Sequence, residues 1–382
     1  MKNILVLMGG VSTEHDISLI TGIQAINNID KNKYAIYPIV IDKKGKWHFL
    51  KDANCIESIT KYFADKKHNK IVTIHDKSLY LLAKNKLKKV ADVDCALFCL
   101  HGGMGENGAI AGFFEAANIP ITCPDHTFSG IFMNKALSKN IFKELDINCT
   151  EHVLIDKYEY QNNKAKVIAY IKQKISLPCC IKPNSQGSSI GVSIAKTHSQ
   201  LLSSIEEAFC FDTQVIVENA ITDLFELNIA IIKKDNKVCL SMIEKPSNKN
   251  KMLSFEDKYM ERGKTSLDGM KRELPAIIDD ETKRYVEKSA EKVYKNFIRQ
   301  GVVRIDYLVD KKTNKVYINE VNTIPGSLSF YLWKDKMSFL ELLDVLIEGS
   351  IESQKYKEGV KTTFESSVLD KYSGGAKLGL KV

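Results

Sequence analysis

The first 120 residues alternate between two hydrophobic patterns. Segments 2–8, 34–42 and 95–100 are almost continuously apolar, which is typical of parallel strands buried on both faces. Segments 14–29 and 108–119 carry apolar residues at helical spacing. Strands that alternate with helices predict an α/β fold with a parallel, Rossmann-like sheet, whose binding loops lie at the carboxyl ends of the strands. These loops contain Gly9, Gly10, His101, Gly102 and Gly103.

The pattern changes from residue 131 onward, where helices and short strands are mixed. We expect a helix at 131–145, a strand at 180–183, a helix at 199–209 and a strand at 214–221. Segment 246–275 is polar, Lys-rich and without periodicity. It predicts a long loop of the kind that often forms a lid over a site.

Three further elements and a tail complete the predicted chain. We expect a helix at 281–298, a β-hairpin at 301–322 and a short helix at 338–348. The last residues, 353–382, contain few apolar side chains and predict a weakly ordered tail. A length of 382 residues favours two or three domains. The changes of pattern predict domains at 1–130, 131–226 and 227–352, followed by the tail at 353–382.

Composition is that of a soluble globular protein, with 44% hydrophobic and 27% charged residues. No apolar run reaches the length of a membrane span, and the N-terminus lacks the apolar core and cleavage site of a signal peptide. The nine cysteines are scattered without a CxxC pair, which favours reduced, buried thiols. We therefore expect a cytoplasmic protein that does not associate with a membrane.

The net charge of +8 comes mainly from lysine runs such as KNK, KKHNK and KNKLKK. A nucleic-acid partner is conceivable for a basic chain. However, these runs lack interleaved aromatic residues and fall in predicted loops, so we expect a solvated surface and no nucleic-acid partner. Small anionic substrates would gain from the same positive field.

The predicted hairpin at 301–322 carries the first candidate chemistry. Two β-rich runs are joined there by the polar turn DKKTNK. Glu320 and Asn322 project to one face of their strand, and folding the hairpin brings Asp306 beside them. Two carboxylates and an amide oxygen, without Cys or His, suit a hard cation such as Mg²⁺. An edge hairpin with solvated acids is the alternative, but Arg304 and the Pro-Gly turn after Asn322 favour a metal site.

A second candidate lies in the segment 177–194, LPCCIKPNSQGSSIGVSI. It predicts a strand ending near Lys182, a loop of small residues between Gly187 and Gly191, and a second strand. Such a loop can offer backbone N–H groups and hydroxyls to a polyphosphate. It is not a Walker A loop, because GxxxxGK[ST] is absent. A Gly/Ser hairpin alone is more often a simple turn, and the predicted metal site favours the phosphate interpretation.

A family resemblance rests on segments that occur in a fixed order. They are HGGMGENG, MNKALSK, CIKPNSQGSSIGV, VIVENAI, KY, RIDY and NEVNTIPGS, preceded by GGVSTEHDISL. Together they resemble the D-alanine–D-alanine ligases of the ATP-grasp superfamily over residues 3–345. The resemblance implies an N-terminal substrate-binding domain followed by central and C-terminal ATP-grasp domains that clasp ATP. It also implies a homodimer that joins two D-alanine molecules through a D-alanyl phosphate, for peptidoglycan precursors.

The resemblance implies roles in ATP and metal binding. Two Mg²⁺ or Mn²⁺ ions would be held by Asp306, Glu320 and Asn322. Glu218 and the backbone near Ile221 would meet adenine. The residues that would bind ATP are Lys135, Lys182, Gly187, Ser189, Glu218, Ile221 and Glu226. Within this set the two lysines would hold phosphates and Glu226 the ribose, although Phe225 stands where the family often has Arg.

The resemblance also implies roles around D-alanine. Glu14 would bind the ammonium of the first D-alanine, and His101 would lie beside its carboxylate. Without the resemblance, Glu14 could simply be an acid in the first turn of a helix, and His101 a hydrogen-bonded histidine at a strand end. Arg304 and the backbone N–H of Gly326 would form an oxyanion hole. The lid would close through Ser188, Tyr259 and Glu14, with Lys258 reaching the transferred phosphate.

The segment PGSLSFYLW at 325–333 departs from the family pattern. Tyr331 and Leu332 stand near the usual Ser-Leu positions that bind the second carboxylate, and Ser329 is a nearby substitute. A ligase for D-serine or D-lactate, or another ATP-grasp carboxylate–amine ligase, therefore remains open. Tyr259 favours D-alanine as the second substrate. A nucleotide-binding protein without catalysis is a third possibility, against which the intact metal residues and Arg304 argue.

Overall fold

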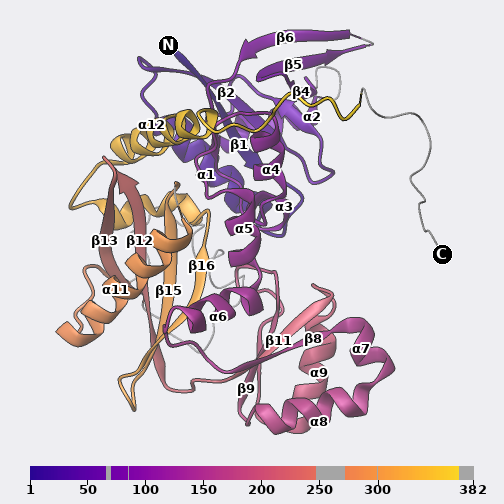
Figure 1. Cartoon of the computed structure of the whole chain (residues 1–382), viewed down its shortest axis with the longest axis vertical. Coiled ribbons are helices and arrows are strands. Elements are labelled where there is room, and N and C mark those ends of the chain that lie inside the picture. The colour runs from indigo at the N-terminus through magenta and orange to yellow at the C-terminus, as the bar shows by residue number, and fades with distance from the viewer. Residues whose placement is uncertain (66–69, 85, 247–271, 299, 370–382) are drawn as a thin grey trace.

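The computed structural model describes residues 1–65, 70–84, 86–246, 272–298 and 300–369. The predicted lid residues Lys258 and Tyr259 lie outside these ranges. Figure 1 shows the N-terminal sheet at one end of the molecule and the sheet of β8, β9 and β11 at the other, with the strands β12, β13, β15 and β16 between them. Searched over the described residues, the helices include none with the length and apolar character that a membrane crossing requires.

The N-terminal sheet has the predicted parallel core. Its order is β3-β2-β1-β7, with β1 parallel to both β2 and β7. Residues 4–8 of β1 are fully buried, which explains their unbroken apolar run. The strands are β1 (Lys2–Gly9), β2 (Tyr34–Ile41), β3 (Trp47–Phe49) and β7 (Cys95–Phe98). The accompanying helices are α1 (His15–Asn28), α2 (Ile56–Ala64), α3 (Gly103–Glu106) and α4 (Ala109–Ala116).

The chain segment that connects β3 to β7 forms an antiparallel three-stranded sheet, which was not predicted. It consists of β4 (Val72–His75), β5 (Ser78–Ala83) and β6 (Lys86–Asp92). The lysine run at 84–89 therefore lies partly in β6 and not in a loop, which corrects that expectation. The residues 86–89 are nevertheless exposed, as expected for a solvated lysine run.

The second region begins with two helices where one was predicted at 131–145. They are α5 (His126–Met133) and α6 (Lys135–Glu144). Asn134 between them has extended backbone, and its side-chain oxygen accepts the Leu137 N–H at 3.0 Å. This N-cap satisfies a free donor of α6, so the helix starts anew there.

The sheet of the second region has the order β10-β9-β11-β8. Its strands are β8 (His152–Asp156), β9 (Cys179–Pro183), β10 (Ser193–Ala195) and β11 (Gln214–Asn219). The core beneath it joins apolar side chains of the sheet to those of its helices. These helices are α7 (Lys157–Asn162), α8 (Lys164–Lys174) and α9 (His198–Ala208).

A five-stranded sheet of order β14-β13-β12-β15-β16 forms the third region. Its strands are β12 (Leu224–Lys234), β13 (Lys237–Pro246), β14 (Arg272–Glu273), β15 (Val303–Asp310) and β16 (Val316–Asn322). One face packs on α11 (Asp280–Phe297), close to the predicted helix. Beyond β16 the chain enters the short 3₁₀ segment η2 (Gly326–Trp333).

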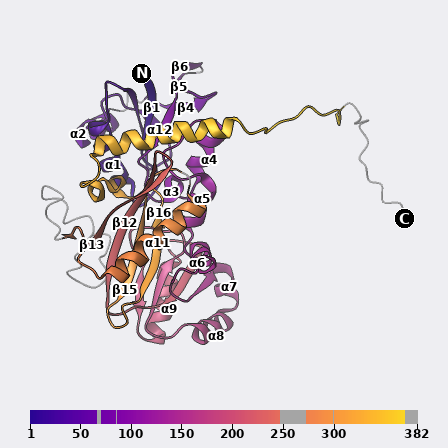
Figure 2. The same cartoon turned by 60° about the vertical axis from the view of Figure 1, so that its left-hand side comes forward.

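The helix expected at 338–348 is longer than predicted. It is α12 (Phe339–Glu358), which begins with a capping box between Ser338 and Glu341. Residues 353–358 are thus helical and do not belong to an irregular tail, while 359–369 are exposed and without regular structure. Figure 2 shows α12 crossing the N-terminal region, with the yellow segment after it leading away from the body.

All nine cysteines are free, and five of them are buried. The expectation of buried thiols is wrong for Cys210, which is exposed, and for three half-buried residues, Cys55, Cys149 and Cys239. The buried ones lie mainly in or next to the strands β7 and β9, where they act as small apolar side chains.

Candidate active site

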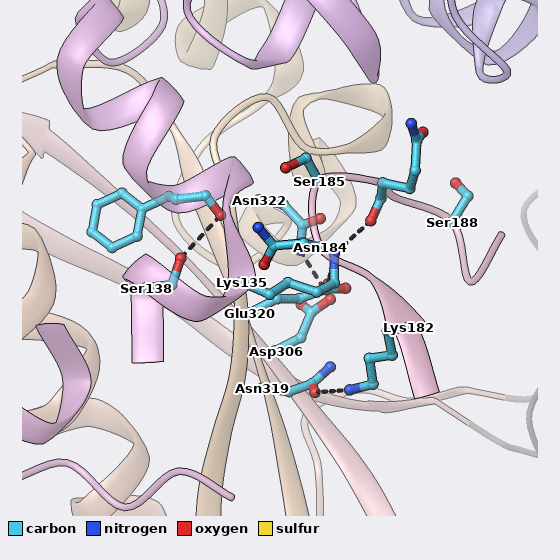
Figure 3. Close-up of polar contacts among 12 residues, drawn as sticks. Lys135, Ser138, Lys182, Asn184, Ser185, Ser188, Asp306, Asn319, Glu320 and Asn322 are labelled. Carbon is cyan, nitrogen blue, oxygen red and sulfur yellow. Dashed lines mark hydrogen bonds and ion pairs between the residues drawn. The ribbon is translucent and has the colours of Figure 1, made fainter. Parts of the chain in front are cut away.

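The β15–β16 hairpin brings the three predicted metal residues together. In the antiparallel register Asp306 lies opposite Glu320, and the Asn322 amide donates to Asp306 Oδ2 at 3.0 Å. An irregularity after Asp306 leaves Asn319 as an additional residue on β16. Val321 packs into the core behind the sheet, so Glu320 and Asn322 project from the opposite face (Figure 3).

These side chains fit a hard cation. Carboxylate and amide oxygens are the ligands that Mg²⁺ prefers. Within the described residues no group of three or more His, Cys, Asp and Glu side chains could hold a metal. A cation at Asp306, Glu320 and Asn322 must therefore complete its shell with oxygens from water or a phosphate, which is how Mg²⁺ is usually bound.

Arg304 is paired with the metal-site carboxylate of Asp306. Its Nε and Nη2 donate to the two oxygens of Asp306 at 2.6 and 2.7 Å. Burial opposes the charge on Arg304, but Asp306 raises its pKa well above the ordinary value. Arg304, the predicted donor to the oxyanion, is therefore held in a bidentate ion pair with one of the predicted metal residues.

Two lysines face the same hairpin from the second region. Lys135 at the start of α6 donates to the Gln186 carbonyl at 2.5 Å, and its Nζ lies 3.8 Å from Glu320. Lys182 at the end of β9 donates to Asn319 Oδ1 at 3.2 Å. Figure 3 shows both lysines beside the metal residues, so the structure places two positive charges where a metal-bound polyphosphate would lie.

Glu218 is enclosed between two lysines, of which Lys139 was not predicted. Its carboxylate lies 3.2 Å from Lys182 and 3.2 Å from Lys139, and both Glu218 and Lys139 are at most 2% exposed. Thr150 donates to Glu218 at 2.5 Å. Burial opposes ionisation, but the two lysines hold the pKa of Glu218 far below its usual range. The carboxylate predicted to meet adenine thus orients Lys182.

Lys139 could have been found from the segment MNKALSK. Lys135 and Lys139 are four residues apart, which places them on one face of α6. The buried member of such a pair needs an acid partner, and only the folded chain identifies that partner as Glu218.

A cavity of about 390 Å³ lies beside the predicted adenine hinge. Its lining includes Ala220 and Ile221 after β11, and Tyr317 of β16. Glu226, the predicted ribose residue, lies opposite Leu308 in the sheet, two residues from the Asn228–Asp306 pair. Alternate residues of a strand share a face, so Glu226 projects from the same face as Asp306.

Glu14 and Ser188 meet across two regions of the chain. The Ser188 hydroxyl donates to the carboxylate of Glu14, which is buried at the start of α1 and makes no helix-capping hydrogen bond. A Cβ at Gly187 would lie 2.7 Å from Glu14 Oε2, and one at Gly102 would lie 2.6 Å from the same atom. Glycines at both positions therefore allow the loops to approach this carboxylate. Tyr259, the third predicted member of the network, lies outside the described residues.

Ser188 and Ser189 give the phosphate loop its shape. Their φ angles of 51° and 59° lie in the left-handed region that non-glycine residues rarely adopt. Strained backbone of this kind concentrates at binding sites, where a loop must present particular N–H groups. Its presence at the predicted phosphate loop supports a binding role over a simple turn.

Glu106, a second buried carboxylate, was also missed. It accepts the Gly102 N–H at 3.0 Å and is 9% exposed. Burial and the nearby Glu14 raise its pKa to about 7. The motif HGGMGENG contains this acid, but its spacing alone does not reveal that the side chain turns inward.

His101 is buried, with both ring nitrogens engaged. Nδ1 lies 2.8 Å from the Ile324 carbonyl, which can only accept, so Nε2 accepts from Thr21 Oγ1 at 2.8 Å. Thr21 in turn accepts the Ser327 N–H at 3.0 Å. Burial lowers the pKa of His101 to about 4, which keeps it neutral. No ring donor remains for a substrate carboxylate, so the hydrogen-bonded histidine is the interpretation that this geometry favours.

The turn that His101 fastens contains Gly326, the predicted oxyanion donor. A Cβ at Gly326 would meet nothing within 4 Å, so the space beside its backbone is open. The next three residues, Ser327, Leu328 and Ser329, all have φ near 50°. A left-handed run without glycine is costly, and backbone of this kind concentrates at functional sites.

The residues predicted to bind the second substrate do not present their side chains to it as expected. Ser329 and Leu332 are fully buried, so neither side chain is accessible to a substrate. The Tyr331 hydroxyl donates to Glu244 Oε2 at 3.1 Å and does not point freely into the site. Direct binding of a carboxylate by Ser329 or Leu332 side chains is therefore not supported by this structure.

Comparisons with known proteins point to one family. The family model described as D-ala D-ala ligase N-terminus matches residues 3–124, and that described as D-ala D-ala ligase C-terminus matches 141–348. A D-alanine–D-alanine ligase of Thermosipho africanus is 34% identical over 97% of this chain and 99% of its own length. A relative of the same name from Caldicellulosiruptor bescii is 34% identical over 95% of this chain and 98% of its own length.

Solved structures give the same result. The VanG D-Ala:D-Ser ligase from Enterococcus faecalis superposes with a TM-score of 0.77 and 27% identity, covering 91% of this chain and 99% of that one. The D-alanine–D-alanine ligase from Bacillus anthracis complexed with ATP gives a TM-score of 0.65 and 26% identity, covering 94% of this chain and 100% of that one. The chain therefore belongs to the D-alanine–D-alanine ligase family and has the α/β ATP-grasp fold that the sequence predicted.

Proposed function

We propose that the protein joins two D-alanine molecules to D-alanyl-D-alanine with ATP, in the synthesis of peptidoglycan precursors. One observation carries this proposal. In a chain of this family, the fold brings together three groups: two lysines, the predicted metal residues, and the pair formed by Ser188 and Glu14. Lys135 and Lys182 face the metal residues of the β15–β16 hairpin, and Ser188 of the phosphate loop reaches Glu14 of the N-terminal region.

The first step activates a carboxylate. A D-alanine carboxylate oxygen attacks the γ-phosphorus of ATP, forming D-alanyl phosphate and releasing ADP. Such transfer needs charge stabilisation and alignment more than a covalent protein nucleophile. Lys135 and Lys182 supply positive charge, and Asp306, Glu320 and Asn322 would hold two Mg²⁺ or Mn²⁺ ions. The bound ions would neutralise charge that develops on the phosphoryl oxygens.

The second step forms the peptide bond. The neutral amine of a second D-alanine attacks the acyl carbon, phosphate leaves with the electron pair of the broken C–O bond, and the attacking nitrogen releases one proton. The oxyanion of the intermediate needs fixed donors, for which Arg304 and the Gly326 N–H are proposed. His101 and Thr21 hold the turn that carries Gly326, so they are positioning residues for this donor.

The remaining proposals concern organisation. We propose a substrate-binding domain at 1–130, a central ATP-grasp domain at 131–226 and a C-terminal ATP-grasp domain beginning at 227. The continuation of α12 to Glu358 extends this last domain beyond the expected boundary at 352. We further propose a homodimer in the cytoplasm, where ATP is available and nine free thiols stay reduced.

The similarity to a D-Ala:D-Ser ligase makes D-serine the second candidate acceptor. The test is product analysis by mass spectrometry at pH 7.5 with ATP, Mg²⁺, D-alanine and equal D-serine or D-lactate. We expect ADP release that requires D-alanine, with D-alanyl-D-alanine as the main product. A mainly mixed dipeptide would assign D-serine, a mainly ester product would assign D-lactate, and ADP release independent of D-alanine would reject the ligase function.

A further inference from the structure

A row of polar side chains crosses the active-site face of the five-stranded sheet. Asn228 on β12 lies opposite Asp306 on one side and opposite Glu244 of β13 on the other. Its amide donates to Glu244 Oε2 at 3.3 Å. Residues directly opposite each other in neighbouring strands share a face. The row that begins with Glu320 and Asp306 therefore continues to Glu244, two strands away from β15.

Arg272 lies on the edge strand next to this row, opposite Pro246 of β13. It is the first residue of β14, and its Nη1 lies 3.3 Å from Glu244 Oε1. The guanidinium carbon lies 4.5 Å from the centre of the Tyr331 ring, a cation–π contact, while the Tyr331 hydroxyl donates to Glu244. We call Arg272, Glu244 and Tyr331 the Arg272 cluster.

The Arg272 cluster orients the Arg272 guanidinium, whose N–H donors are mostly unused. Glu244 is 4% exposed, and its oxygens face Arg272, Tyr331 and Asn228, so it fixes the arginine. A guanidinium has five N–H donors. Among the described residues Arg272 makes no hydrogen bond, and its Nε is enclosed without a partner. A planar cation held in this way matches the two oxygens of a carboxylate.

We infer that Arg272 binds the carboxylate of the acceptor amino acid, and that Tyr331 and Glu244 position it. This inference rests on the proposed ligase function. Asp306 and Arg272 are three strand spacings apart across the sheet, about 14 Å, and Arg272 is also shifted by two residues along its strand. Both amino acids fit end to end in that interval, with the acyl phosphate at the metal residues and the acceptor carboxylate at Arg272. Tyr331 then acts through Arg272, because its hydroxyl is already used by Glu244.

The test is a competition between two acceptors. D-Alaninamide has no carboxylate, so it cannot be phosphorylated and can only accept the D-alanyl group. The enzyme is given ATP, Mg²⁺ and equal D-alanine and D-alaninamide, and both products are quantified by mass spectrometry. Their ratio compares the two acceptors for one common D-alanyl phosphate. We expect Arg272→Ala to lower the ratio of D-alanyl-D-alanine to its amide about 10- to 100-fold.

Three further proteins make the result decisive. Arg284→Ala removes an exposed arginine of α11 and should keep the wild-type ratio. Arg272→Lys keeps the charge without the fork and should give an intermediate ratio. Tyr331→Phe should lower the ratio less than Arg272→Ala does. An unchanged ratio in Arg272→Ala, even with both products reduced, would overturn the inference. No dipeptide from the wild type would instead reject the ligase function.

Discussion

The buried charges around Glu218 are tolerated because each has a partner on another element. Glu218 on β11 lies between Lys139 of α6 and Lys182 of β9. Burial lowers the pKa of Lys182, but Glu218 raises it more, so the pKa lies well above the usual value. Lys182 therefore stays charged at neutral pH. A charge held in place before the substrate arrives needs no reorganisation when phosphoryl transfer begins.

The first residue-scale prediction concerns the metal hairpin. Glu320→Gln keeps the size of the side chain but removes one anionic ligand, so turnover should fall by at least about 100-fold with normal folding. The measurements are D-alanine-dependent ADP release and the melting temperature. Glu57→Gln, at an exposed position of α2, is the matched control and should keep full activity. Near wild-type turnover in Glu320→Gln would remove this residue from the metal site.

His101 makes a prediction about pH. Its pKa is lowered to about 4 in the folded protein from an ordinary value near 6.5, so the unfolded chain binds the extra proton first. The stability from neutral His101 is fully present above pH 6.5 and is lost as pH falls towards 4, by on the order of 3 kcal/mol. His101→Gln should remove this part of the pH dependence in urea unfolding curves. Parallel curves for both proteins between pH 4 and 6.5 would contradict the assignment.

At the scale of elements, segments with a clear period were predictable and segments defined by tertiary contacts were not. The buried strands β1, β2 and β7 and the β15–β16 hairpin follow directly from hydrophobic runs and a polar turn. The strands β4 to β6 are short and β6 is lysine-rich, so their pattern was weak. The break at Asn134 depends on one capping hydrogen bond inside an otherwise helical pattern.

The residues of the candidate site divide in the same way, into those that could be predicted from the sequence and those that could not. Motif positions such as Glu14 and Ser188 were predicted through the resemblance, and the folded chain brings them into contact. Glu106 and Glu244 were missed, because an acid in the sequence gives no sign of whether its side chain is buried. The left-handed run at 327–329 was also unpredictable, since Ser-Leu-Ser contains none of the residues that favour such backbone.

The phosphate loop provides the element-scale prediction. Gly187→Ala would place a Cβ 2.7 Å from Glu14 Oε2, and a shift of this carboxylate would disturb the hydrogen bond that Ser188 donates to its other oxygen. We expect kcat/KM for D-alanine to fall about 10- to 100-fold, because a small displacement of a positioning group is costly, while the melting temperature changes little. Gly349→Ala in α12 is the control, since its Cβ would meet nothing within 4 Å. Full activity in Gly187→Ala would show that this close approach is not required.

At the scale of the whole molecule, one core joins the two ends of the chain. Buried side chains of β1 and β7 belong to the same hydrophobic cluster as Trp333 of η2 and Leu343 of α12. The turn that carries Gly326 leads directly into these buried elements. The turn that carries Gly326 is therefore fixed to the N-terminal sheet both by packing and by the hydrogen bonds of His101.

The extent of this core predicts where the chain can be shortened without loss of stability. Ending it after Glu358 removes 359–382, of which the described part, 359–369, is exposed and without regular structure. Loss of exposed residues should change the melting temperature by less than about 2 °C and leave ADP release unchanged. Ending the chain after Asp344 removes the buried Leu346, Ile347 and Ser350.

The shorter chain should behave differently, because each buried aliphatic side chain that is lost costs about 2–5 kcal/mol. We expect it to melt many degrees lower or to fail to fold, and to lose ADP release with its structure. Calorimetry and the ADP assay on both chains make the comparison. A large loss of stability in the chain ending at Glu358 would show that the tail packs on the body. A stable, active chain ending at Asp344 would show that the last turns of α12 do not secure the site.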